Sequence, residues 1–343
     1  MFAGFVGSGL LTAAVSGDIF ASPPTQRTVK LIEKICGNNK NNEILIIIAN
    51  YTGDRLNFGL VREQLLLKSY KTELFVFGED LAFYGEGKRV GRRGLAGISL
   101  IHKLSGAMAE QGMTSKQIKD KLIEFSDLIG TISVSLTSSN IPGTGSSFTL
   151  APDEIEVGLG AHGEAGVQRL KLCTASEVVK VMLNHLIGET SLLYEPLKKF
   201  DQKLVVLVNN LGGLSQFEFN IIIKETVSQL EELNFIIERI YSGTFMTSFG
   251  MSGVSITIMA ANDTILELLD RPSSSSVWQQ LLNVPKILNR SVILDKTDSI
   301  KEETDINYQS IDGLGFGHKL FVRSVELSAK ALVENHLIQN YFI

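Results

Sequence analysis

A short run of aliphatic residues limits the folds that are open to this chain. The segment Glu43–Ala49 is apolar at almost every position, which predicts a strand buried on both faces. The turn Asn50-Tyr51-Thr52-Gly53-Asp54 follows at once, and residues 55–69 then carry leucines near helical spacing. A strand, a turn and a helix in this order are typical of a parallel βαβ unit. We therefore expect an α/β protein.

The same alternation continues to about residue 260. Further strands are expected at 72–77, 131–136, 155–159, 204–208, 235–241 and 253–260, and helices at 95–111, 115–130, 175–187 and 218–233. The length suggests two domains or one large one, and a second block of strands begins at residue 131; we expect α/β domains at 1–127 and 128–285, with mainly parallel or mixed sheets flanked by helices. The charged stretch 295–305 predicts a linker over 286–311, and the amphipathic stretch 314–337 predicts a C-terminal helix within 312–343.

Composition excludes several classes of function. The net charge of −5 disfavours nucleic acid as a partner, because phosphate binding needs clustered Lys and Arg. The chain has two distant cysteines, Cys36 and Cys173, so we expect reduced thiols and a cytoplasmic protein. Its longest central apolar run is far shorter than the roughly 20 residues of a membrane span.

The first 15 residues are apolar and rich in small side chains. They could pass for a signal peptide, but the first basic residue is Arg27, and glycines interrupt the segment. We interpret Met1–Val15 as a loop and helix from a folded interior.

A glycine-rich loop, 158–166, is the strongest candidate for chemistry. It places His162 among Gly158, Gly160, Gly163 and Gly166. A single histidine is more often structural, but glycines let a backbone approach a ligand closely. An imidazole nitrogen is a competent nucleophile toward a carbonyl carbon, and Glu164 could orient the ring. Two interpretations therefore stay open for His162: a structural histidine, and a nucleophile that binds a small carbonyl compound. Zinc is not expected, because no second histidine lies nearby and no Cys-x-x-Cys occurs.

Asp54 is a second candidate. Gly53 permits a tight turn, which puts Asp54 near the start of the following helix. Two interpretations stay open: an aspartate that caps the helix, which the spacing alone favours, and a general acid/base at the mouth of a pocket.

Arg89, Arg92 and Arg93 form a basic cluster that could meet a phosphate, although a solvated loop is the simpler interpretation. The other histidines, His102, His185, His318 and His336, lie in helical patterns and are expected to be structural or on the surface.

Several blocks together resemble dihydroxyacetone kinases of the ATP-dependent, single-chain eukaryotic type. They run in order over residues 1–285: Ala3-Gly4-Phe5-Val6-Gly7, Leu11 to Pro24, Asn50 to Phe58, Gly91-Arg92-Arg93-Gly94-Leu95-Ala96-Gly97, Gly158 to Gly166, Asn209 to Ser215, and Gly243-Thr244-Phe245-Met246.

This resemblance implies a substrate-binding half in which His162 bonds to the ketone carbon of dihydroxyacetone or the aldehyde carbon of glyceraldehyde, giving a hemiaminal. It assigns proton transfer to Asp54 and substrate contacts to Gly53, Gly160 and Gly163. The resemblance further implies a homodimer. Animal members of this family also resemble enzymes that cyclise FAD.

The chain departs from the family pattern at three places. A Gly-Gly-Gly-Ser-Gly-His block would precede Met1, many relatives have Lys where this sequence has Ala49, and the helical ATP-binding domain with its metal-binding aspartates would begin only near Leu314. We therefore expect a chain trimmed at both ends, with ATP and Mg²⁺ supplied by a domain absent from it, and little or no turnover in isolation. The alternatives are a non-catalytic substrate-binding or regulatory module, and a product without a stable fold.

Overall fold

The computed structural model describes residues 2–37, 39–85, 91–143, 145–146 and 148–278. The linker expected over 286–311 and the helix expected within 312–343 lie outside these residues. No described helix has the length and apolar character needed to cross a membrane. Cys36 and Cys173 are both free thiols.

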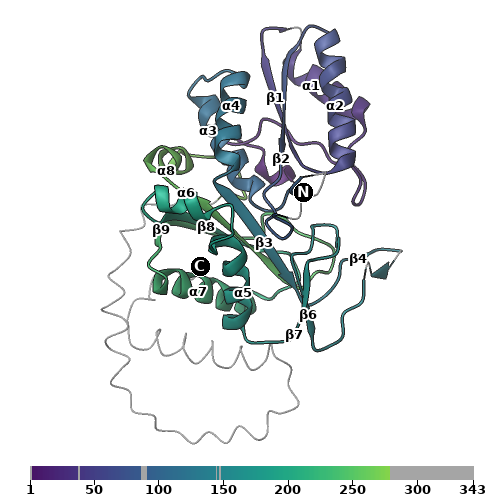
Figure 1. Ribbon diagram of the computed structural model, residues 1–343. Coiled ribbons are helices and arrows are strands. Elements are labelled where there is room, and N and C mark those ends of the chain that lie inside the picture. The colour runs from purple at the N-terminus through teal and green to yellow at the C-terminus, as the bar shows by residue number, and fades with distance from the viewer. Residues whose placement is uncertain (1, 38, 86–90, 144, 147, 279–343) are drawn as a thin grey trace, which may run out of the picture.

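The N-terminal part is the βαβ unit that the sequence predicts. Strand β1 (Glu43–Ala49) pairs in parallel with β2 (Lys71–Phe77), and α2 (Thr52–Leu67) connects them. Helices α1 (Thr25–Cys36) and α2 cover one face of this two-stranded sheet, while α3 (Ile98–Glu110) and α4 (Ser115–Ser126) lie on the other side (Figure 1). Because side chains alternate along a strand, Ile46 and Ile48 face α1 and α2.

The second part is built on a six-stranded mixed sheet in the order β7-β6-β3-β10-β8-β9. Its strands are β3 (Ile129–Ser135), β6 (Glu154–Val157), β7 (Gln168–Lys171), β8 (Lys203–Asn210), β9 (Ile236–Gly243) and β10 (Gly253–Ala260). Strands β8 and β9 are parallel, and the other neighbours are antiparallel. The predicted α/β class with mixed sheets is thus confirmed, while parallel crossovers are limited to β1-α2-β2 and β8-α7-β9 among the described elements. Antiparallel neighbours need no crossover helix.

Helices cover both faces of this sheet (Figure 1). Helices α5 (Ala175–Ile187) and α7 (Gln216–Glu232) pack on one face, against Leu204, Val206 and Val208 of β8. The intervening Val205 and Leu207 point to the opposite face, where α3 and α8 (Asp263–Asp270) lie. The short helix α6 (Tyr194–Lys199) precedes β8.

The two sheets are joined where β2 ends. Asp80 forms a parallel bridge with Thr131 of β3; the amide of Thr131 donates to Glu79 O (2.9 Å) and the amide of Leu81 donates to Thr131 O (2.9 Å). The boundary that we expected at 127/128 falls between α4 and β3, and remains a prediction.

Three local predictions differ from the structure in detail. The N-terminal segment is a loop with a short helix, as expected, but the helix is a 3-10 helix, Phe2–Phe5, and no α-helix precedes α1 among the described residues. Its backbone instead packs against the segment around Ser274, where the amide of Ser8 donates to Ser274 Oγ (2.8 Å). The helix expected over 115–130 ends at Ser126, because residues from Ile129 onward pair with β10. The loop expected over 137–147 contains a small hairpin, β4 (Asn140–Ile141) and β5 (Gly145–Ser146).

Candidate functional site

Loops that follow several strands meet at one place between the two sheets. Leu159 from the loop after β6, Leu211 from the loop after β8 and Met251 from the loop before β10 form one small buried cluster. The turn after β1, which starts α2, reaches the same region, since the Tyr51 ring packs on His162. These contacts place His162 where loops at the ends of several strands converge, which is a common place for a ligand in α/β proteins.

The backbone of the His162 loop is fixed by its own residues. The amide of Gly160 donates to Glu164 O (3.0 Å), and the amide of Gly163 donates to Gly160 O (3.1 Å). Gly163 has φ +82°, a conformation that side chains other than glycine rarely adopt. A Cβ on Gly160 would lie 2.1 Å from Glu164 Oε2. Glycine at 160 therefore makes room for the Glu164 carboxylate.

Glu164 holds His162 by two hydrogen bonds, one to its backbone amide and one to its imidazole ring. Its Oε2 accepts from the His162 amide (3.0 Å) and its Oε1 lies 2.9 Å from His162 Nδ1. Burial works to raise the pKa of Glu164, but its hydrogen bond and charge interaction with His162 outweigh burial and hold that pKa below the ordinary value. An ionised carboxylate only accepts hydrogen bonds, so Nδ1 carries the hydrogen, and Nε2 of the neutral ring keeps a free electron pair.

Two aromatic rings enclose the imidazole. Phe20 and Tyr51 meet it edge-to-face, with centroid distances of 4.8 Å and 4.7 Å and interplanar angles of 90° and 84°. Phe20 also contacts Phe249 (5.1 Å), and the Tyr51 hydroxyl donates to Gly94 O (3.0 Å). His162 keeps 30% of its side-chain surface exposed. The ring is therefore fixed by its neighbours and remains accessible.

Asp54 lies in the first turn of α2, but it is not the cap. The cap position belongs to Tyr51, whose side chain makes no capping hydrogen bond, so the capping interpretation is wrong. Burial raises the pKa of Asp54, while a hydrogen bond with Ser22 and the charge of His162 act in the opposite direction. Ser22 also lies against Gly53, since a Cβ there would be 2.6 Å from Ser22 Oγ. The structure thus brings Asp54, Gly53 and Ser22 together, and Asp54 within electrostatic reach of His162.

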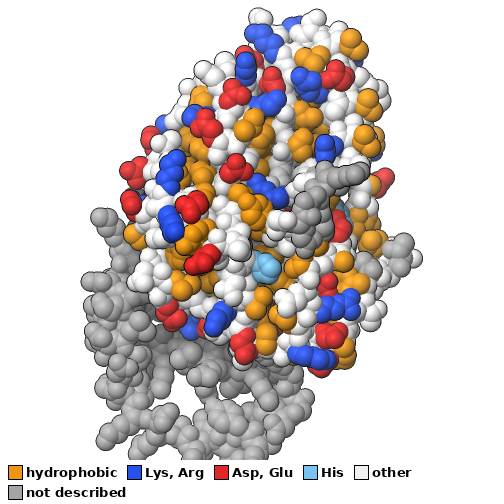
Figure 2. All heavy atoms as spheres, viewed as in Figure 1, with side chains coloured by type: hydrophobic (Ala, Val, Ile, Leu, Met, Phe, Trp, Pro, Cys, Tyr) orange, Lys and Arg blue, Asp and Glu red, His pale blue; other side chains and the backbone are white. Residues whose placement is uncertain are grey.

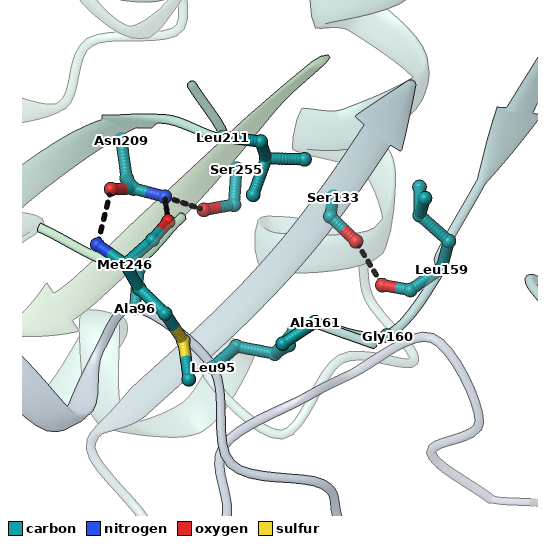
Figure 3. Close-up of a pocket in the computed structure, with 10 residues that line it drawn as sticks. All are labelled: Leu95, Ala96, Ser133, Leu159, Gly160, Ala161, Asn209, Leu211, Met246 and Ser255. Atoms are coloured by element: carbon teal, nitrogen blue, oxygen red, sulfur yellow. Dashed lines mark hydrogen bonds between the residues drawn. The ribbon is translucent and has the colours of Figure 1, made fainter. Parts of the chain in front are cut away.

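A small cavity lies behind the loop, against Gly160 and Ala161 (Figure 3). Its polar wall consists of Ser133 on β3, Ser255 on β10 and Asn209 on β8, all of which are buried. Ser133 Oγ donates to Leu159 O, which ties the start of the loop to the sheet (Figure 3).

Asn209 anchors the segment before β10. Its Nδ2 donates to Met246 O (2.8 Å) and Ser255 Oγ (3.2 Å), and its Oδ1 accepts from the amides of Phe245 (2.8 Å) and Met246 (2.9 Å). In the sequence, Asn209 stood out only as part of a motif. The available signal was a pair of asparagines at the end of an otherwise apolar strand.

The Arg92 and Arg93 side chains are mostly buried, with 19% and 17% of their surface exposed, so the interpretation of a solvated loop is wrong for both. Arg89 lies outside the described residues. Arg92 donates to Ser126 O (3.0 Å) and Ile129 O (3.2 Å). Arg93 pairs with Asp80 at 2.6 Å and donates to Gly158 O.

Another histidine, His102, lies in the hydrophobic core. His102 on α3 is buried between the rings of Phe2 and Phe5, and burial lowers its pKa to about 3. No group of three or more potential metal ligands occurs among the described residues. On the face drawn in Figure 2, acidic and basic side chains are interspersed rather than gathered by sign.

Known proteins are similar to this chain in both sequence and fold. Residues 1–277 match the Dak1 domain. The human triokinase/FMN cyclase is 41% identical over 282 residues, which cover 82% of this chain and 48% of that protein. The dihydroxyacetone-binding subunit DhaK of a PTS-dependent dihydroxyacetone kinase of Listeria innocua is 33% identical over 278 residues, covering 80% of this chain and 82% of the subunit.

Two solved structures have the same fold. The dihydroxyacetone kinase from C. freundii, in complex with AMP-PNP and Mg²⁺, superposes with a TM-score of 0.72 at 31% identity, covering 81% of this chain and 49% of that one. The dihydroxyacetone kinase operon co-activator Dha-DhaQ superposes with a TM-score of 0.74 at 28% identity, covering 80% and 83%. The chain spans about half the length of the mammalian relatives it matches. The chain belongs to the Dak1 domain family.

Proposed function

We propose that this chain is the substrate-binding half of an ATP-dependent dihydroxyacetone kinase, and that it holds dihydroxyacetone or glyceraldehyde covalently on His162. The observation that carries this proposal is the pairing of His162 Nδ1 with the Glu164 carboxylate at 2.9 Å. That pairing keeps Nε2 as a nucleophile, and Phe20 and Tyr51 hold the ring in place.

Capture of the substrate is an addition to its carbonyl group. The Nε2 electron pair forms a bond to the carbonyl carbon, the C=O π pair moves onto oxygen, and that oxygen takes a proton from the solvent to give a hemiaminal hydroxyl, while the ring keeps its Nδ1 hydrogen and becomes positively charged. The positive charge that develops on the ring lies next to the Glu164 carboxylate, which stabilises it. Glycerol has no carbonyl carbon, so it cannot be held in this way.

Phosphoryl transfer then uses a free hydroxyl of the bound substrate. As this oxygen attacks the γ-phosphorus of ATP, its proton passes to Asp54, whose raised pKa favours accepting it. ATP and Mg²⁺ are held by a separate ATP-binding domain, which delivers the phosphoryl group to the substrate on His162; the AMP-PNP and Mg²⁺ complex of the C. freundii kinase supports this division. A cytoplasmic homodimer of the α/β domains 1–127 and 128–285 is part of the same proposal.

The test is capture of dihydroxyacetone labelled at its central carbon, followed by carbon NMR. The proposal predicts that the ketone signal is replaced by that of a tetrahedral carbon bound to protein. His162→Gln, a variant of similar size that lacks the nucleophile, should abolish the new signal, and labelled glycerol should give none with either protein. A tetrahedral signal that survives in His162→Gln refutes the assignment.

A regulatory binding module is the second candidate, and the likeness to the co-activator Dha-DhaQ favours it. Such a module would still capture the carbonyl compound but would not hand it to a kinase. Mixing this chain with the ATP-binding domain of a relative and measuring ATP-dependent phosphorylation separates the two. Turnover that requires His162 supports the kinase half, and capture without turnover supports the module.

A further inference from the structure

One guanidinium group contacts both ends of the His162 loop. Arg93 Nη2 donates to Gly158 O (2.5 Å), where the loop begins, and Nη1 donates to Ala165 O (3.4 Å), near its end. The same Nη1 would lie 3.0 Å from a Cβ on Gly160, so the guanidinium also borders the middle of the loop. Arg93 comes from the segment after β2, far away in sequence.

The guanidinium is itself fixed from the opposite side. Its Nε donates to Asp80 Oδ2 (2.6 Å), and the Asp80 side chain is only 2% exposed. Asp80 Oδ1 accepts from the amide of Ala82 (2.9 Å), and the Asp80 backbone bridges Thr131 of β3. The ring of Phe83 lies 4.9 Å from Arg93 Cζ. The loop is therefore tied through Arg93 to the core of the sheet.

We propose that Arg93 is a positioning residue, which holds the 158–166 loop at both ends and thereby keeps the His162 ring against Glu164. This proposal rests on the proposed function, because positioning His162 affects catalysis only if His162 binds the substrate. The planar guanidinium offers several donors in a fixed arrangement, so it can serve Asp80 and two separate carbonyl groups at once. A lysine could keep the ion pair with Asp80 but could not span both carbonyls.

The test compares Arg93→Lys with Arg92→Lys. Arg92 is the matched control: it is adjacent and part-buried, and it also donates to two carbonyls, but these belong to Ser126 and Ile129, outside the 158–166 loop. Nitrogen NMR of histidine-labelled protein reports which ring nitrogen of His162 carries the hydrogen. His162→Gln identifies the signal.

In the wild type and in Arg92→Lys, His162 should show the Nδ1–H form. Arg93→Lys should give a mixture of both tautomers and capture dihydroxyacetone about tenfold or more weakly, because small displacements of a reacting group are costly. An unchanged tautomer and unchanged capture in Arg93→Lys overturn the proposal. So does an equal effect of Arg92→Lys, which would indicate a general loss of stability.

A double variant, Arg93→Gln with Asp80→Asn, covers the case in which Arg93→Lys does not fold. It removes both charges of the pair together, so no buried charge is left alone. The same tautomer mixture is expected. If the wild type captures no carbonyl compound, the proposed function fails, but the tautomer measurement still decides whether Arg93 positions His162.

Discussion

Replacing Gly160 with alanine should weaken carbonyl capture without touching His162 itself. The new Cβ would lie 2.1 Å from Glu164 Oε2 and 2.7 Å from its Cδ, whereas ordinary contact begins at 3.4 Å. The carboxylate must therefore move away by about 1 Å or more. Its 2.9 Å contact with His162 Nδ1 and its 3.0 Å contact with the His162 amide then exceed hydrogen-bonding distance.

The size of the effect follows from the bonds lost. A hydrogen bond to a charged group contributes about 1.5–3 kcal/mol, which corresponds to about ten- to hundredfold weaker capture of dihydroxyacetone. Titrating the protein with labelled dihydroxyacetone and following the tetrahedral carbon signal gives the apparent Kd.

Gly59→Ala is the matched control. Gly59 lies inside α2, and a Cβ there would meet nothing within 4 Å. This variant should capture dihydroxyacetone like the wild type and be more stable by about 0.5–1 kcal/mol, since alanine favours a helix. If Gly160→Ala folds and captures dihydroxyacetone as tightly as Gly59→Ala does, Glu164 does not control the reactivity of His162.

Three further predictions concern stability, each measured by urea unfolding. Burial raises the pKa of the Glu79 carboxyl from 4.5 to about 7, so between these pH values the folded state holds a proton that the unfolded state has lost. The free energy of unfolding should therefore fall by about 3 kcal/mol as the pH rises from 4.5 to 7. Glu79→Gln should remove that fall. Asn209→Leu leaves the amides of Phe245 and Met246 unpaired and should cost about 3 kcal/mol or more; a loss below about 1 kcal/mol contradicts this. Burial lowers the pKa of His102 from 6.5 to about 3, so stability should fall as pH decreases below 6.5, and His102→Phe should flatten that slope.

Elements with a strong local pattern could be predicted closely. The strands Glu43–Ala49 and Gly253–Ala260 and the helix Ala175–Ile187 agree with the expected bounds. The helix begins after Thr174, which forms a capping box with Glu177. Strand β7, by contrast, is mostly exposed and has no alternation of apolar and polar residues, so its sequence did not predict a strand. Strand order and direction depend on contacts between distant segments, which a local pattern does not contain.

The site was predictable only in part. His162 stands out in its glycine loop and Asp54 after the Gly53 turn, while the role of Asp54 in proton transfer came only from the family resemblance. The contacts that give His162 its properties come from elsewhere in the chain: Phe20 is an aromatic residue in an irregular segment, and Arg93 resembled a surface charge. Such roles are set by tertiary neighbours, so spacing in the sequence does not reveal them.

The central claim is a covalent bond between His162 and a carbonyl substrate. A crystal of the chain soaked with dihydroxyacetone tests it directly. We expect continuous electron density from His162 Nε2 to a tetrahedral central carbon, with Nδ1 still paired to Glu164. Dihydroxyacetone bound in the site with a planar carbonyl and a clear gap to His162, or no dihydroxyacetone at His162 at all, would contradict it.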